Sequence, residues 1–155
     1  INKYELITET GHLKLDRVGY SSLAYPFAYG CLPRTWDEDG DPLDIEIVNV
    51  TEPLVPGSIV EARILGIMTF DDGGEVDDKV IGVIADDKRM DHIKSFEQLG
   101  KHWIKETTYY WEHYKDLKKP GTCTVNGFFG VEKAVEIIKS CEKRYFSEID
   151  PNLIN

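Results

Sequence analysis

Short runs of β-branched and aromatic residues, separated by glycine and proline, fill about the first two thirds of the chain. Runs of this length and composition are typical of β-strands. The predicted strands cover residues 3–7, 12–18, 44–50, 59–70 and 79–85. In the third of these, Ile45 and Ile47 alternate with Asp44 and Glu46, which predicts a strand with one buried face and one polar face.

The last third of the chain shows helical periodicity instead. Residues 95–114 predict a helical region that Gly100 divides in two, and residues 131–145 predict a second helix. A short strand is expected between them, over residues 122–125. Because no repeat or linker is visible, residues 1–155 are expected to form a single domain of the α+β class, mainly β, built on a small barrel or twisted sheet.

The overall charge narrows the choice of partners. The chain carries 28 acidic and 18 basic residues, and a net charge of −10 repels nucleic acid and acidic membrane surfaces. No apolar run reaches the roughly 20 residues that span a bilayer, so no membrane partner is expected. Cys31, Cys123 and Cys141 are odd in number and form no C-x-x-C pair, which favours reduced thiols and a cytoplasmic location.

A first acidic segment, residues 37–44, holds five carboxylates in eight positions. Its sequence is Asp-Glu-Asp-Gly-Asp-Pro-Leu-Asp, in which glycine and proline favour a tight turn. Such a turn would bring Asp39, Asp41 and Asp44 into one small volume, where like charges repel unless a cation joins them. Oxygen ligands without histidine or cysteine favour Mg²⁺ or Ca²⁺ over zinc.

Two other interpretations of the first acidic segment exist. A solvated acidic loop has the same composition, and this interpretation stays open. A calcium-binding EF-hand shares the first spacings. However, Pro42 occupies the position that needs glycine, and Val48 the position of the bidentate glutamate, so the EF-hand is excluded.

A second acidic segment, residues 71–79, also leads into a predicted strand. It contains Asp72, Asp77 and two adjacent glycines, so a polar hairpin loop is the simplest interpretation. Asp77 and Lys79 are two residues apart and would project from the same side of a strand. Two acidic segments that face one another would be able to share metal ions.

Basic and tyrosine side chains are the candidates for phosphate contact. They are Lys3, Arg17, Lys79, Lys115, Tyr25, Tyr29 and Tyr114. Arginine offers a planar fork to phosphate oxygens, lysine a point charge and tyrosine a neutral hydroxyl donor. Each residue alone is more typical of a surface charge or a core aromatic. Together with metal ions held by carboxylates, they would bind a highly charged anion.

Several of these residues resemble the motifs of a known family. Residues 39–44 match the D-G-D-P-x-D signature of family I soluble inorganic pyrophosphatases, and the chain is similar to the bacterial type. Further matches follow in the family's order over about three quarters of the chain. They are Lys3-Tyr4-Glu5, Asp16-Arg17, Tyr25-Pro26, Tyr29-Gly30, Asp72, Asp77, Lys79, Asp91-His92-Ile93 and residues 112–117.

The resemblance implies magnesium-dependent hydrolysis of inorganic pyrophosphate to two phosphates, a reaction that drives biosynthetic steps releasing pyrophosphate. Several Mg²⁺ ions would occupy each active site. Asp39, Asp44 and Asp77 would bind the tighter metal, and Asp44 would also serve a second metal. Asp72 and Asp77 would bind a metal that arrives with substrate. Asp41 would accept a proton from the attacking water. The implied phosphate ligands are Lys3, Arg17, Tyr29, Lys79, Tyr114 and Lys115, supported by Glu5 near metal-bound water and Tyr25 as a hydrogen-bond donor behind them.

The same resemblance implies a five-stranded, OB-fold-like β-barrel with flanking α-helices, and a homohexamer. This sequence departs from the family pattern in three respects. The family has a further active-site glutamate upstream of Lys3, in a segment that this sequence does not show. Gly73 stands where many relatives have an acidic residue, which predicts weaker metal binding there. Tyr109 stands where some bacterial relatives use a histidine in subunit contact, which weakens the expectation of a hexamer.

Three other functions share part of this pattern. A non-catalytic calcium- or magnesium-binding module would need the carboxylates but not Arg17, Lys79 or Lys115. A nucleic-acid-binding barrel conflicts with the net charge of −10. Hydrolysis of another phosphoanhydride, such as a nucleotide, would need a nucleobase pocket, and no pattern in the sequence indicates one.

Overall fold

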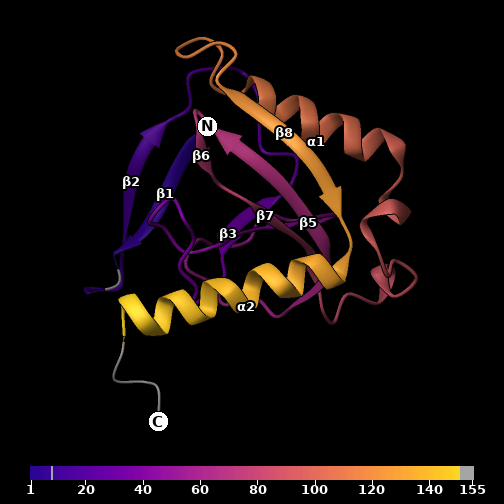
Figure 1. Ribbon diagram of the computed structural model, residues 1–155. Helices are drawn as coiled ribbons and strands as arrows, with labels where there is room; N and C mark the ends of the chain where they lie inside the picture. Colours follow the sequence, from indigo (N-terminus) through magenta and orange to yellow (C-terminus); the bar gives the residue numbers. More distant parts are fainter. Residues whose placement is uncertain (8, 151–155) are drawn as a thin grey trace.

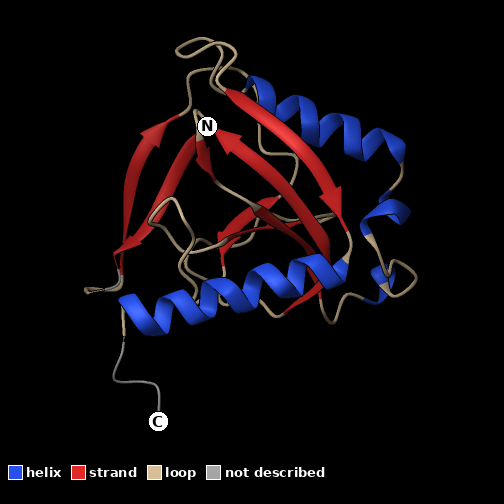
Figure 2. Ribbon diagram, viewed as in Figure 1, coloured by secondary structure: helices blue, strands red, loops and turns tan. Residues whose placement is uncertain are grey.

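The computed structural model describes residues 1–7 and 9–150, which form a mainly β fold with two α-helices (Figures 1 and 2). The strands are β1 (Asn2–Ile7), β2 (His12–Val18), β3 (Ala28–Cys31), β4 (Asp44–Ile47), β5 (Ala62–Asp72), β6 (Glu75–Val76), β7 (Lys79–Ile84) and β8 (Cys123–Phe129). The helices are α1 (Lys101–His113) and α2 (Val131–Glu148), with short 3-10 helices at Lys88–Met90 and Phe96–Leu99. The α+β, mainly β class is therefore confirmed.

The strands divide into a hairpin and a larger sheet. Strands β1 and β2 pair with each other and lie to one side of the main sheet (Figure 1). The main sheet has the order β3-β4-β7-β5-β6, and β8 pairs with β5. All of these pairs are antiparallel except β4 with β7, which run parallel. Both strands of the parallel pair therefore begin at the same edge of the sheet.

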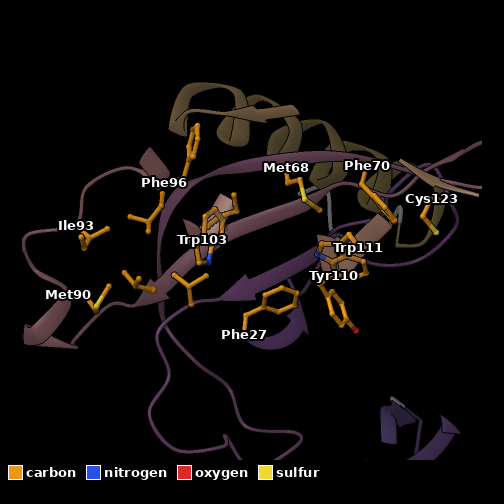
Figure 3. Packing of buried hydrophobic residues seen from close by; sticks show 14 residues of the cluster. Phe27, Met68, Phe70, Met90, Ile93, Phe96, Trp103, Tyr110, Trp111 and Cys123 are labelled. Carbon is orange, nitrogen blue, oxygen red and sulfur yellow. The ribbon is translucent and has the colours of Figure 1, made fainter. Parts of the chain in front are cut away.

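Hydrophobic residues cover both faces of this sheet. One cluster lies under α1 and includes Phe27, Phe70 and Trp111, and Figure 3 shows Tyr110 beside these aromatic rings. The other cluster lies under α2 and joins residues of β4 and β7 to Ala134 of the helix. A central strand of such a sheet has no solvent-facing side.

The prediction that the strand at residues 44–50 has one solvent-facing side is wrong. Glu46 is fully buried on the α1 side, where its Oε1 accepts a hydrogen bond from Trp111 Nε1. The period-two alternation is real, but both faces of β4 are covered, so Glu46 faces the core. The strand also ends at Ile47 rather than at residue 50.

Other element boundaries differ from the expected ones in ways that the pairing explains. The expected loop around Gly30 contains β3, which forms because it pairs with β4 along its whole length. Strand β8 continues to Phe129 because it pairs with β5. A side chain at Gly66 of β5 would meet the Phe129 carbonyl oxygen at 2.4 Å, so only glycine allows this close approach. The break at Gly100 (φ 93°) is confirmed.

No helix of the described residues is both long and apolar enough to cross a membrane.

Candidate active site

The parallel pairing of β4 and β7 brings the two acidic segments together. Asp44 and Lys79 are the first residues of these strands, and their Cα atoms are register partners. The segments that precede the two strands therefore enter the sheet side by side. Strand β5 ends at this edge with Asp72, and β8 begins there with Cys123 opposite Asp72. One edge of the sheet thus collects residues that lie far apart in the sequence.

Helix α2 fixes the first acidic segment against the sheet. Asp37 is buried, and its Oδ1 accepts a hydrogen bond from the backbone N–H of Glu38 (2.9 Å) and lies 3.6 Å from Nη1 of Arg144. Arg144 also donates to the carbonyl oxygen of Trp36 at 2.7 Å. The turn itself passes through Gly40 at a φ of 85°, a left-handed conformation that favours glycine.

Lys79 lies at the centre of the site. Its side chain is fully buried, and Nζ lies 2.7 Å from Oδ2 of Asp44 and also pairs with Oδ1 of Asp77. The Trp111 ring centroid is 5.0 Å from the ammonium, a distance at which a cation is attracted to the ring. Burial lowers the pKa of Lys79, but the charges of Asp44 and Asp77 outweigh it and raise the pKa above its usual value. Lys79 is therefore a permanent cation held between two carboxylates.

Tyr29 of β3 completes the contacts of Asp44. Its hydroxyl donates to Asp44 Oδ2, the same oxygen that contacts Lys79. Burial and the neighbouring Asp44 charge hold the pKa of Tyr29 well above its usual range, so the hydroxyl remains a donor. Tyr25 stacks on the Tyr29 ring with centroids 5.2 Å apart, a packing contact that helps to hold the Tyr29 ring in place.

Two more carboxylates of the site, Asp39 and Asp77, have pKa values above the usual range of an aspartate. Burial raises the pKa of Asp39 to about 6, and the charge of Asp77 contributes to this shift. Burial also raises the pKa of Asp77, with Asp44 and Asp72 acting in the same direction against Lys79. Asp41 differs from them: its side chain is exposed, while its backbone N–H donates to Asp39 Oδ1 at 3.0 Å.

Asp72 organises a second group of predicted site residues. Its Oδ2 pairs with Lys115 Nζ and lies 3.4 Å from the Tyr114 hydroxyl. Burial would raise the pKa of Asp72, but the hydrogen bond and charge of Lys115 outweigh it and lower the pKa. Tyr114 and Lys115 follow directly after α1, so the end of this helix delivers both donors to the end of β5.

The hairpin of β1 and β2 carries a third group. Lys3 is the register partner of Arg17, and a β-bulge follows it. Lys3 Nζ lies 2.9 Å from Glu5 Oε1, and Arg17 Nε lies 2.6 Å from Asp16 Oδ2. Arg17 and Lys115 line one cavity, so the hairpin faces the second group.

A divalent cation such as Mg²⁺ needs several oxygen ligands around one point. Among residues 1–7 and 9–150, no three carboxylate, histidine or cysteine side chains converge closely enough to hold a metal ion. However, Asp44 and Asp77 already share a cation, the Lys79 ammonium, and Asp39 lies near enough for the Asp77 charge to raise its pKa. Clustered carboxylate oxygens, two of which have a raised pKa, fit Mg²⁺ in chemistry because a cation relieves their mutual repulsion. The individual metal ligands stay a prediction.

The sequence reasoning did not single out three residues that the structure places beside the predicted ones. Tyr20, Lys118 and Lys119 line the same cavity as Arg17 and Lys115. In the sequence, the only indication of these residues was the lysine pair Lys118-Lys119 shortly after Tyr114-Lys115. Tyr20 offered none, because only the pairing of β1 with β2 brings it to this place.

Clustered carboxylates beside lysine, arginine and tyrosine donors define a class of site. Such an arrangement suits a metal-dependent enzyme that acts on phosphate groups, since the metal and the basic residues both neutralise substrate charge.

Comparisons with known proteins show which family the chain matches. A family model described as inorganic pyrophosphatase matches residues 1–146. The inorganic pyrophosphatase of Geobacillus stearothermophilus is 43% identical over 144 residues, which cover 93% of this chain and 86% of that protein. The crystal structure of an inorganic pyrophosphatase from Neisseria gonorrhoeae is similar with a TM-score of 0.87 and 41% identity, over 93% of this chain and 83% of that one. The inorganic pyrophosphatase structure from Thermus thermophilus matches with a TM-score of 0.85, 40% identity and the same two coverages.

The chain belongs to the inorganic pyrophosphatase family. The resemblance first based on residues 39–44 is therefore confirmed.

Proposed function

We propose that this chain hydrolyses inorganic pyrophosphate to two orthophosphates at the sheet edge where the two acidic segments meet, with Mg²⁺ as the metal. The observation that carries this proposal is the parallel register of β4 and β7, which sets Asp44 opposite Lys79. It supports a shared site because it brings Asp44 and Asp77 onto one cation. Membership of the inorganic pyrophosphatase family supports the reaction.

The carboxylates are the proposed metal ligands. Asp39, Asp44 and Asp77 would hold one Mg²⁺, and Asp72 with Asp77 another. When bound, Mg²⁺ neutralises substrate oxygens and lowers the pKa of water so that it attacks near neutral pH. Asp41 accepts a proton from the attacking water in this proposal, and its exposed carboxylate beside Asp39 suits that role.

The basic residues and tyrosines are the proposed phosphate ligands. Arg17 and Lys115 line one cavity between the hairpin and the end of β5, and Lys3 lies opposite Arg17 in the same hairpin. The Tyr114 hydroxyl lies beside Asp72 at the end of β5. Donors of this kind hold the leaving phosphate and stabilise the charge that develops on it. Tyr29 and Lys79 both contact Asp44. Glu5 pairs with Lys3, and Tyr25 supports Tyr29.

The proposal extends to the whole molecule. Residues 1–155 would be one inorganic pyrophosphatase domain, of which residues 151–155 lie outside the described range. The main sheet would form part of the five-stranded, OB-fold-like barrel that the family resemblance of residues 39–44 implies. The protein would act in the cytoplasm as a homohexamer, with no nucleic acid or membrane as partner.

A phosphate-release assay tests this function. Purified protein should release phosphate from pyrophosphate when Mg²⁺ is present and lose that activity when the metal is chelated. Binding of Mg²⁺ without phosphate release would instead indicate a non-catalytic cation module. A higher kcat/KM for ATP than for pyrophosphate would indicate a nucleotide hydrolase.

A further inference from the structure

A buried glutamate lies behind the proposed phosphate ligands. Glu46 of β4 is fully buried, and its Oε1 accepts a hydrogen bond from Nε1 of Trp111 in α1. Its Oε2 is also buried and has no hydrogen-bond partner among residues 1–7 and 9–150. A buried polar atom without a partner lowers stability, and an apolar residue of similar size would avoid this loss. The packing of the core alone therefore does not account for a carboxyl group at this position.

The strand pairing places this glutamate on the same face of the sheet as the site. Glu46 is the register partner of Tyr29, and it follows Asp44 by two residues, so the three side chains project from one face. Asp44 is in turn the register partner of Lys79. The Glu46 carboxyl group therefore lies directly behind the carboxylate that contacts both Tyr29 and Lys79.

The indole ring of Trp111 contacts three of the proposed phosphate ligands. Its centroid lies 5.0 Å from Lys79 Nζ. The ring centroids of Tyr29 and Tyr114 lie 5.6 Å and 5.2 Å from it. Lys79 belongs to β7, Tyr29 to β3 and Tyr114 to the turn after α1. One buried ring therefore packs against donors that three separate elements deliver to the site.

The hydrogen bond to Glu46 selects the orientation of this ring. The χ2 torsion of a tryptophan is broad and roughly two-fold, so apolar packing alone allows more than one orientation of the indole. Phe27 stacks on the ring at a centroid distance of 5.9 Å, and Phe70 packs against it at 5.3 Å (Figure 3). Neither phenylalanine has a hydrogen-bonding group, whereas Glu46 accepts from the only polar atom of the indole.

We propose that Glu46 and Trp111 are positioning residues of the pyrophosphate site. Glu46 sets the orientation of the indole, and the indole sets the positions of the Tyr29, Lys79 and Tyr114 donors that bind phosphate. Neither of the two positioning residues touches the substrate. The inference rests on the proposed function, because that function assigns the three donors to phosphate.

Substitutions at the two ends of the hydrogen bond test this role in steady-state kinetics with pyrophosphate and Mg²⁺. Glu46→Leu removes the acceptor, and Trp111→Phe removes the donor but keeps an aromatic ring. Each should lower kcat/KM by about tenfold, because a misplacement of about 1 Å costs up to about 10²-fold. Glu46→Gln keeps an acceptor for Nε1 and should recover most of this loss. A loss in E46Q equal to that in E46L would overturn the proposal.

Trp103→Phe is the matched control on the same helix. Trp103 is also buried, but its Nε1 has no hydrogen-bond partner in the part of the chain that the structure describes. Removing this N–H group should therefore leave kcat/KM unchanged. A loss in W103F as large as that in W111F would indicate a general effect of the helix packing and would overturn the proposal. If E46L does not fold, the comparison of W111F with W103F decides the question.

The double variant E46L/W111F shows whether the two residues act through one another. Residues that share one interaction have non-additive effects, whereas independent residues add their free energies. The double variant should therefore lose about tenfold in kcat/KM, as each single variant does. A loss of about a hundredfold would show that the two residues act independently. That result would overturn the proposal, as would a kcat/KM equal to the wild-type value in either single variant.

Calorimetry with methylenediphosphonate and Mg²⁺ measures binding without hydrolysis, because this diphosphonate has a carbon atom in place of the bridging oxygen. E46L should bind it about tenfold more weakly than the wild type and E46Q do, since the phosphate donors are then misaligned. If this difference is found in a protein that releases no phosphate from pyrophosphate, the proposed function fails and the positioning role stands. Hydrolysis of pyrophosphate with equal diphosphonate affinity in the three proteins gives the reverse conclusion.

Discussion

Lys79 Nζ lies 2.7 Å from Asp44 Oδ2, and the same two residues are register partners at the start of the parallel strands β4 and β7. The pairing of the two strands and the charge balance of the site therefore involve the same two residues. Because Lys79 also pairs with Asp77, one ammonium group neutralises a carboxylate from each acidic segment. This ammonium group therefore links the two segments.

The first prediction concerns the loss of that ammonium. Lys79→Met leaves Asp44 and Asp77 partly buried without a cation, and breaking a buried pair costs up to about 3–5 kcal/mol. Urea denaturation without Mg²⁺ should show a loss of this order in the free energy of unfolding. Saturating Mg²⁺ should recover much of it, because a divalent cation neutralises the same carboxylates. An equal loss of unfolding free energy with and without Mg²⁺ would show that Lys79 does not share its carboxylate partners with a metal site.

The second prediction concerns the hydroxyl of Tyr29. Tyr29→Phe removes a donor to Asp44, and a hydrogen bond to a charged group contributes about 1.5–3 kcal/mol. We expect weaker Mg²⁺ binding in calorimetry, since Asp44 is then less well oriented, together with a lower free energy of unfolding. Tyr109→Phe is the matched control, because Tyr109 is exposed on α1. Equal Mg²⁺ affinity in both variants would contradict the assignment of Asp44.

The third prediction concerns the proton acceptor. Asp41→Asn should lower kcat for pyrophosphate by about 10²–10⁴, the range for general acid–base catalysis, with little change in stability because the side chain is exposed. The control Asp86→Asn makes the same change of charge at an exposed position paired with Lys88. Steady-state kinetics decides the outcome: a kcat within a few-fold of the wild-type value would remove Asp41 from the mechanism.

The fourth prediction concerns the pH dependence of stability. Burial raises the pKa of Glu46 from 4.5 to about 8, although the Trp111 hydrogen bond and the Lys79 charge oppose this. Between these two pH values the folded protein keeps a proton that the unfolded chain releases. The contribution of Glu46 to stability therefore falls as pH rises from about 4.5 to about 8, by a few kcal/mol at most.

Glu46→Gln isolates this effect from that of other groups. The amide oxygen of glutamine still accepts from Trp111 Nε1 but does not titrate. The free energies of unfolding of the two proteins should differ little at pH 5, and the variant should become progressively more stable than the wild type towards pH 8. A difference that does not vary with pH would show that Glu46 does not change its protonation state in this range.

The sequence predicted the two acidic segments because their signals are local, whereas the roles of their individual residues stay predictions. The glycine and proline of residues 39–44 predict a turn, and the carboxylates around them offer the oxygen ligands that a hard cation prefers. The pairing of Asp77 with Lys79 follows from their spacing and is found in the structure. The resemblance to the D-G-D-P-x-D family then linked site residues that lie far apart in the sequence and share no local pattern.

What the sequence did not reveal depends on contacts between distant strands. Nothing local indicates that β4 pairs with β7 in parallel, although this pairing determines which carboxylates meet. The burial of Glu46 has the same origin, since alternation marks two faces of a strand but not what covers each face. Strand β3 is only four residues long and forms through its partner, so propensity alone misses it.

A crystal grown with Mn²⁺, which prefers the same oxygen ligands as Mg²⁺, tests the central claim most directly. The anomalous difference map should contain a peak between the two acidic segments, in contact with carboxylate oxygens of Asp39, Asp44 and Asp77. Lys79 Nζ should then have moved away from at least one of its two carboxylate partners. A map with no peak at this edge of the sheet, from crystals that bind Mn²⁺ elsewhere, would contradict the account.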